Sequence, residues 1–292
     1  MQPYKNLMIL SMTGFGRAEA LFEGKKVSVD IKSLNSKNFD LNIKTPVRYK
    51  EKEYEIRKML NDRILRGKVD CYIQCENLEE SNDVTINRDV INNYISQLKD
   101  ISADGPDFEY LKMAVRMPEA LSTKTSEIDE PEWQFLFGVV SEAVGRFLEF
   151  RKTEGLTLHK ELEKNLLKIE SNLAKVPGFE EERIANMKDR YQSSLKEFEN
   201  IDETRYYQEI MFYIEKLDIS EEKVRLAQHI RYYLDVMNTE DFNGKKLGFI
   251  AQEMGREINT LGSKANHSQI QKLVVEMKDD LEKIKEQTLN IL

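Results

Sequence analysis

The sequence predicts an α+β protein, with an N-terminal ββαβ-type domain followed by a mainly α-helical C-terminal part that contains a long antiparallel helical hairpin. Apolar residues alternate early in the chain, as at Val27, Val29 and Ile31, and this period of two is typical of strands that bury one face. Beyond residue 87 the apolar residues instead recur every three or four positions, which is typical of amphipathic helices. One long helical pattern is interrupted by Pro177-Gly178, a pair that favours a turn.

These patterns predict the elements in order. Strands are expected at residues 8–22 and 27–43, a helix at 50–65 and a further strand at 69–75. The helices expected after them cover residues 90–101, 108–117, 131–176, 180–216, 220–236, 244–261 and 269–291. The hairpin would join 131–176 to 180–216, as an arm about 50 Å long. We therefore predict an α+β domain over residues 1–118, a helical region with the hairpin over 119–218 and a helical domain over 219–292.

The composition indicates a protein that works away from membranes. Of the 292 residues, 40% are apolar and 33% are charged, which predicts a buried core together with long solvated helices, in an extended shape or an oligomer. No uncharged apolar run is long enough to cross a bilayer, and the N-terminus lacks a signal-peptide pattern. Cys71 and Cys75 are too far apart in a strand for a disulfide, and no partners follow them at zinc-ligand spacing. We expect a soluble cytoplasmic protein with reduced thiols.

Charge is distributed unevenly along the chain. The net charge is −8, but residues 1–76 hold fifteen Lys or Arg against ten Asp or Glu, a balance of +5, which leaves −13 for the remainder. In this basic part, cationic and amide side chains lie near small residues, an arrangement that suits contacts with phosphates and sugars. The candidates are Arg17, Lys32, Asn35, Arg66 and Lys68. The alternative for Gly67, between the last two, is a structural role at the end of a helix and the start of a strand.

Residues 244–264, with the sequence GKKLGFIAQEMGREINTLGSK, sort into stripes when they are wound as a helix. An apolar stripe runs from Leu247 to Leu261, and glycines at positions 248, 255 and 262 form another. Each interior glycine costs a helix about 1 kcal/mol relative to alanine, so these glycines indicate a backbone that another element approaches closely. The alternative for Gly262 is a C-cap.

The same helix carries a polar stripe that consists of Glu253, Arg256, Glu257, Thr260 and Lys264. Two carboxylates one turn apart, with an arginine between them, suit a divalent metal or a phosphodiester. The alternative is a solvated face held by ion pairs within the helix. In the helix before it, His229 shares a face with Glu221, Glu222 and Arg225 and is a candidate ligand or general base. A satisfied structural histidine is the alternative there.

Six ordered blocks resemble one known family. The run QEMGREINTLGSKANHSQI, followed by VVEMKDDLEKIKEQTLNI, is similar to the C-terminal signature of the YicC/YloC-type endoribonucleases, and SMTGFGRAE resembles their N-terminal signature. Between these come, in the same order, IKSLNSKNFDLNIKTP, RILRGKVD, FRKTEG and EEKVRLAQH. A chance match is implausible because the blocks span almost the whole chain. The resemblance implies a bacterial, cytoplasmic, metal-dependent endoribonuclease that assembles as a hexameric ring.

We therefore predict an endoribonuclease that cleaves single-stranded or structured RNA with Mg²⁺ or Mn²⁺, in a ring-shaped homo-oligomer. Glu253, Glu257 and His229 are the predicted metal ligands and catalytic residues, Glu221 or Glu222 is expected to orient the histidine, and Arg256 is expected to hold the scissile phosphate. The predicted RNA-binding residues are Arg17, Lys32, Asn35, Arg66, Lys68 and Lys264.

Two alternatives remain open at this point. The RNA 2′-OH can act as the nucleophile with His229 as base and without a metal. The protein can also be a non-catalytic RNA-binding ring or scaffold that works with another nuclease. Aromatic stacking platforms would favour such a scaffold, but Phe15, Phe39 and Tyr72 are scattered through the N-terminal blocks, so we prefer the enzyme.

Overall fold

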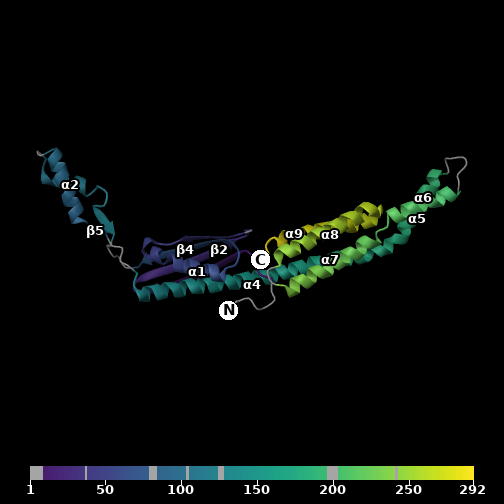
Figure 1. Ribbon diagram of the computed structural model, residues 1–292, viewed down its shortest axis with the longest axis horizontal. Coiled ribbons are helices and arrows are strands. Elements are labelled where there is room, and N and C mark those ends of the chain that lie inside the picture. Colours follow the sequence, from purple (N-terminus) through teal and green to yellow (C-terminus); the bar gives the residue numbers. More distant parts are fainter. Residues whose placement is uncertain are drawn as a thin grey trace.

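One long helix joins a β-sheet to a helical bundle. The computed structural model describes residues 9–36, 38–78, 84–102, 105–123, 128–195, 203–240 and 243–292. Its fold is α+β, as predicted, and the molecule is elongated (Figure 1). Helix α4 (Glu130–Lys175) runs along the sheet with its first half and along the bundle with its second. In the described part of the chain, no helix is both long and apolar enough to cross a membrane.

The sheet contains one strand more than the predicted ββαβ order. Its strands are β1 (Gly14–Phe22), β2 (Lys25–Leu34), β3 (Phe39–Lys44) and β4 (Gly67–Asn77), and they lie in the order β1-β2-β4-β3. All pairs are antiparallel except β3 with β4. Because β3 precedes α1 (Glu53–Arg63), the order is βββαβ, and the predicted strand at 27–43 is in fact two strands. The polar run that separates them, NSKN, favours a turn over a continuous strand.

One face of the sheet is covered and the other is open. Val29, Ile31 and Val69 point to the covered face, where they pack against Leu60 of α1 and Phe147 of α4. The opposite face, called the outer face below, carries the alternate side chains of the same strands. On the covered side, glycines bring β1 close to α4.

At Gly16, an added Cβ would lie 2.2 Å from the carbonyl oxygen of Ala143. The glycines of the SMTGFGRAE block are therefore in a strand that packs on a helix. They lie within the strand predicted at residues 8–22 and serve packing on α4, not contact with phosphates.

A small satellite follows the sheet in the chain. Strands β5 (Val84–Ile86) and β6 (Leu121–Thr123) pair with each other, and they flank α2 (Arg88–Ile101) and α3 (Asp107–Ala114). The two helices confirm the predictions for residues 90–101 and 108–117, whereas the two short strands were not predicted. Three buried residues form the core of this satellite, namely Ile91, Ala114 and Ala120.

The predicted hairpin between residues 131–176 and 180–216 is wrong in its position. After α4 the chain forms a 3₁₀ turn (Val176–Phe179) and continues into α5 (Glu180–Leu195), which leads away from the bundle, and α6 (Glu203–Lys216) returns (Figure 1). The reversal thus lies between α5 and α6, and α4 packs against α7 (Ser220–Thr239) and α9 (Ser268–Thr288) instead of α5. Pro177 sits in the first turn of the 3₁₀ helix, where a missing N–H is tolerated, so it does not reverse the chain.

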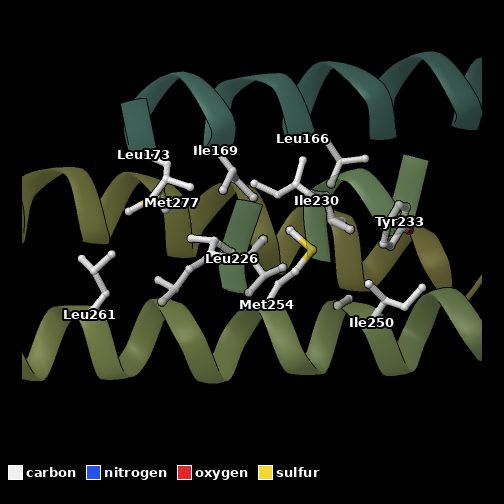
Figure 2. Close-up of a cluster of buried hydrophobic side chains, with 14 of the residues drawn as sticks. Leu166, Ile169, Leu173, Leu226, Ile230, Tyr233, Ile250, Met254, Leu261 and Met277 are labelled. Atoms are coloured by element: carbon white, nitrogen blue, oxygen red, sulfur yellow. The ribbon is translucent and has the colours of Figure 1, made fainter. Parts of the chain in front are cut away.

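The bundle is built from α4, α7, α8 (Gly244–Ala265) and α9, and the last three confirm the predicted helices. Figure 2 shows side chains of these helices pointing toward one another, among them Ile169, Leu226, Met254 and Met277, which are all buried. Such burial contributes about 25 cal/mol per Å² of apolar area removed from water.

The glycines of α8 have the predicted role at two positions. An added Cβ at Gly255 would lie 3.3 Å from Leu281 and one at Gly262 would lie 2.9 Å from Val274, so α9 is the element that approaches closely. Gly262 is not the C-cap, because α8 ends at Asn266 with a left-handed φ of 40°. An added Cβ at Gly248 would have no neighbour within 4 Å in the described part of the chain.

Candidate active site

The polar stripe of α8 lies beside α7, and two ion pairs fix how these helices align. Glu222, near the start of α7, pairs with Lys264 near the end of α8 at 2.6 Å, and Lys246 near the start of α8 pairs with Glu240 just after α7. The helices are therefore antiparallel. His229 is seven residues after Glu222 on α7, and Glu257 is seven residues before Lys264 on α8. Because the helices are antiparallel, His229 and Glu257 lie at the same level along them.

We call the residues along this line the α7–α8 polar seam; they are Glu222, His229, Glu253, Glu257 and Lys264. His229 and Glu257 are half-buried, and neither makes a hydrogen bond or an ion pair with a described residue. A histidine and a carboxylate at one level of a helix pair, both reachable from solvent and uncommitted to structural partners, are placed to exchange protons with a bound molecule.

Part of the α8 polar stripe is held by an ion pair within the helix, which was the alternative to a metal or phosphate site. Arg256 Nη1 lies 2.8 Å from Glu253 Oε1, one turn apart on the helix, and 74% of the arginine side chain is exposed. An exposed pair of this kind contributes about 0.5 kcal/mol, so Arg256 can leave Glu253 for a phosphate at little cost. Glu257 does not take part in this pair.

Glu222 does not orient His229 as the sequence suggested. It is buried, with 5% of its surface exposed, and one carboxylate oxygen accepts from Lys264 while the other has no partner among the described residues. Glu221 instead pairs with Arg225 on the exposed side of α7. Lys264, predicted to bind RNA, therefore already compensates a buried charge, which is a structural task.

The predicted metal ligands do not form a ligand set in this chain. Among the described residues, no three His, Cys, Asp or Glu side chains lie close enough together to hold a metal ion. Glu253, Glu257 and His229 as metal ligands therefore remain a prediction. Within one chain, the two carboxylates are on α8 and the histidine is on α7.

The candidate RNA-binding residues of the N-terminal part fall into two groups. Arg17, Lys32 and Lys68 lie on the outer face, where Arg17 bonds to Glu19 and lies 3.6 Å from Asp30. The hydrogen bond that Arg17 donates to Glu19 raises the pKa of Arg17 above its ordinary value. Lys32 and Lys68 are exposed and make no ion pair with a described residue.

The other two candidates make structural bonds near the end of the sheet. Asn35 donates to the carbonyl of Leu289 at 2.5 Å, and Arg66 donates to the carbonyl of Ser36 at 3.2 Å. Gly67 begins β4 with a φ of 117°, so it has the structural role that was its alternative. The outer face and the α7–α8 polar seam belong to different parts of the molecule (Figure 1).

Sequence reasoning missed Arg151, which is the largest fully buried side chain of the described residues. Its Nη2 donates to the carbonyls of Met12 and Arg66 and to Ser33 Oγ at 2.8–3.0 Å, and its guanidinium lies 4.5 Å from the ring centroid of Phe147. Arg151 of α4 thereby holds together the segment before β1 and the start of β4. Its position in the FRKTEG block is the sequence signal that could have identified it.

Comparison with known proteins places these features in one family. A family model described as "Endoribonuclease YicC-like, N-terminal region" matches residues 9–160, and one described as "Endoribonuclease YicC-like, C-terminal" matches residues 174–292. The chain belongs to the YicC-like endoribonuclease family. The first YicC-like region covers the sheet, the satellite and α4 as far as residue 160, and the second covers α5–α9.

Two curated YicC relatives match along their whole length. The chain is 32% identical over 293 residues to a probable endoribonuclease YicC of Clostridioides difficile (strain 630), with 97% of this chain and 100% of the relative covered. It is 27% identical to a probable endoribonuclease YicC of Haemophilus influenzae, with the same shares covered. Both the sheet and the bundle of the YicC-like fold are therefore included in the likeness.

Proposed function

We propose that this protein is an endoribonuclease that cleaves RNA phosphodiester bonds, with the α7–α8 polar seam as its active site. The observation that carries the proposal is the likeness, over 97% of the chain, to relatives named probable endoribonucleases. The seam supports it, because its acid–base groups lie beside the exposed Arg256, the partner of Glu253.

Each residue of the seam, and Arg256 beside it, has a task in this proposal. His229 and Glu257 exchange protons with the attacking and leaving oxygens, a role that typically contributes 10²–10⁴-fold to a rate. Arg256 binds the phosphate and stabilises the negative charge that develops there. Glu253 holds Arg256 in place before RNA binds, since the two are already paired. Lys264 keeps Glu222 neutralised at the end of the seam.

Dependence on Mg²⁺ or Mn²⁺ and assembly into a ring-shaped homo-oligomer, a hexamer by family resemblance, are further parts of the proposal. Metal dependence rests on the resemblance and on the two α8 carboxylates one turn apart, Glu253 and Glu257. We derive no step through a metal, because the described residues of one chain do not form a ligand set. Light scattering of the purified protein tests the assembly.

The test of function is cleavage of an end-labelled structured RNA by purified protein, with Mg²⁺ or Mn²⁺ and with EDTA. We expect internal cuts, and the product ends distinguish the nucleophile: 2′,3′-cyclic phosphates indicate attack by the 2′-OH, and 5′-phosphates with 3′-OH ends indicate attack by water. Cleavage that survives EDTA removes the metal from the proposal.

Variants locate the site. His229→Ala and Glu257→Gln are expected to slow single-turnover cleavage at least about 100-fold while RNA affinity and circular dichroism stay unchanged. Glu282→Gln controls for the loss of a carboxylate from the bundle surface, because Glu282 is on α9, outside the seam, where it pairs with Lys285 at 2.7 Å. Parental rates in both test variants would show that the seam is structural. RNA that is bound but never cut would favour the scaffold.

A further inference from the structure

No described helix or strand packs on the outer face of the sheet, although this face carries large apolar side chains. Helices α1 and α4 both pack on the covered face. On the outer face, Phe15 is 41% exposed, Leu34 is 62% exposed and Leu21 is 67% exposed. Isolated apolar residues on a surface need no explanation, but an open sheet face with aromatic rings on it is a candidate binding surface.

Strand pairing brings together two aromatic rings that are 57 residues apart in the sequence. Phe15 of β1 is opposite Lys32 of β2, and Lys44 of β3 is opposite Tyr72 of β4. Because β2 lies between β1 and β4, and because Phe15 and Tyr72 are offset by two residues along the strands, their backbone positions are about 12 Å apart. That separation is wide enough for each ring to contact its own planar group.

Each ring is accompanied by a lysine. Lys32 Nζ lies 5.7 Å from the ring centroid of Phe15, and Lys44 Nζ lies 5.2 Å from that of Tyr72. Neither lysine makes an ion pair with a described residue. An ammonium beside an aromatic ring is placed to meet the phosphate of a nucleotide whose base stacks on that ring.

The other two basic residues of the outer face, Arg17 and Lys26, have acidic partners. Glu19 pairs with Arg17 and with Lys26, and Arg17 also lies 3.6 Å from Asp30. Asp70 accepts from the amide of Asn42 at 2.9 Å. Asp40 and Glu76 are the remaining acids, at the two ends of β3 and β4. Lys32, Lys44 and Lys68 make no ion pair with a described residue, although Asp70 is opposite Lys32 and Asp40 is opposite Lys68 on the neighbouring strands, so their ammonium groups can turn to phosphates beside the rings.

We propose that the outer face is a stacking platform for single-stranded RNA, with one base on Phe15, another on Tyr72, and the backbone phosphates beside Lys32, Lys44 and Lys68. This inference rests on the proposed function, because it assigns the substrate of that nuclease a second contact surface, away from the α7–α8 polar seam. Single strands are the fitting form of RNA, because a duplex keeps its bases stacked on each other and inaccessible to side chains. The platform would hold an unpaired segment while another part of the RNA reaches the seam.

The first experiment measures affinity by fluorescence anisotropy, with a labelled 12-nucleotide oligo(A) and with a 12-base-pair RNA duplex, at fixed salt. Phe15→Ala and Tyr72→Ala are expected to weaken oligo(A) binding about tenfold each, in line with the loss of one base–aromatic stack, and to change duplex binding little. Leu21→Ala is the matched control, because Leu21 is on β1 and on the same face but carries no aromatic ring, and the lysine opposite it, Lys26, already pairs with Glu19. Equal affinity in all four proteins would overturn the proposal.

The second experiment reports stacking itself. Phe15→Trp is expected to retain binding, and oligo(A) should quench the new indole, because a base stacked on it shortens its excited state. The native Trp133 is buried in the core, so its emission should change little. Leu21→Trp provides the control for quenching without stacking. Binding of oligo(A) to Phe15→Trp without quenching would count against stacking on this ring.

The outcomes separate this inference from the proposed function. If the parent cuts RNA while the aromatic variants bind oligo(A) normally, the platform is wrong and the nuclease stands. If the parent cuts nothing while these variants lose oligo(A) binding, the platform stands and the nuclease does not. If light scattering shows that Phe15→Ala or Tyr72→Ala dissociates an oligomer without lowering affinity per chain, the outer face is an interface between copies and the platform is wrong.

Discussion

A substitution at Gly155 should break the junction between the sheet and the bundle. Gly155 lies inside α4, where glycine normally weakens a helix. An added Cβ there would be 1.9 Å from the carbonyl oxygen of Ile9 and 3.1 Å from the Cα of Leu10, and both are backbone atoms that cannot rotate away. The segment they belong to bonds to the C-terminal end of the chain, since Met12 N donates to the carbonyl of Asn290 at 2.8 Å and Leu292 N donates to that of Leu10 at 3.0 Å.

The size of the effect follows from two opposing contributions. Alanine in place of an interior helical glycine gains about 1 kcal/mol of helix propensity. Relief of the clash by backbone movement costs about 1–3 kcal/mol, and the loss of two backbone hydrogen bonds costs about 1 kcal/mol each. We therefore expect Gly155→Ala to lower the free energy of unfolding by about 3 kcal/mol.

Gly145→Ala is the control, because Gly145 is exposed on the same helix and an added Cβ would have no described atom within 4 Å. It should raise the free energy of unfolding by about 1 kcal/mol. Urea unfolding followed by circular dichroism measures both changes at unchanged m-value. Equal stability of the two alanine variants would refute the close packing of the N-terminal segment on α4.

Three further predictions concern charged residues. Lys264→Met should lower the free energy of unfolding by about 3 kcal/mol, measured in urea, because it leaves the buried carboxylate of Glu222 without its cation; an unchanged midpoint would contradict that task. Glu132 is buried, which by itself raises its pKa, but Arg48, Tyr49 and Lys25 more than offset this and hold the pKa below the ordinary 4.5. This carboxylate therefore contributes stability that is present above pH 4.5 and is lost as the pH falls. Glu132→Gln should be less stable than the parent at pH 7 and should lose less stability than the parent on acidification. Thermal melts of both proteins at several pH values measure this difference. Lys68→Ala should reduce the slope of log affinity against log salt for single-stranded RNA by about 0.7, and Arg17→Ala should reduce it less, because Arg17 already has acidic partners; equal slopes in both variants would argue against the platform.

Much of the candidate site was predictable, because its signals are local. The α8 stripe is a pattern within one helix, so the sequence sorts Glu253 and Glu257 from the apolar residues that are buried. The spacing of Gly255 and Gly262 likewise predicted that a neighbour approaches closely, although it could not name α9. What the pattern could not predict was the partner of each charge. Lys264 belongs to a buried carboxylate on another helix, which only the packing of α7 on α8 decides.

By itself, the sequence determined the fold class, the helices of the bundle, the family and the candidate residues, because alternation, helical periodicity and ordered motifs are written within short stretches of chain. The tertiary structure decided where distant stretches meet. The sequence predicted that the chain reverses after α4, at Pro177. In the structure the antiparallel helices are α5 and α6, because a proline in a first helical turn does not turn the chain back. The tertiary structure also placed β2 between β1 and β4, so that Phe15 and Tyr72, which are far apart in the sequence, share one face, each with a lysine near its ring. Strand order depends on the burial of the whole sheet against α1 and α4, and no local pattern encodes it.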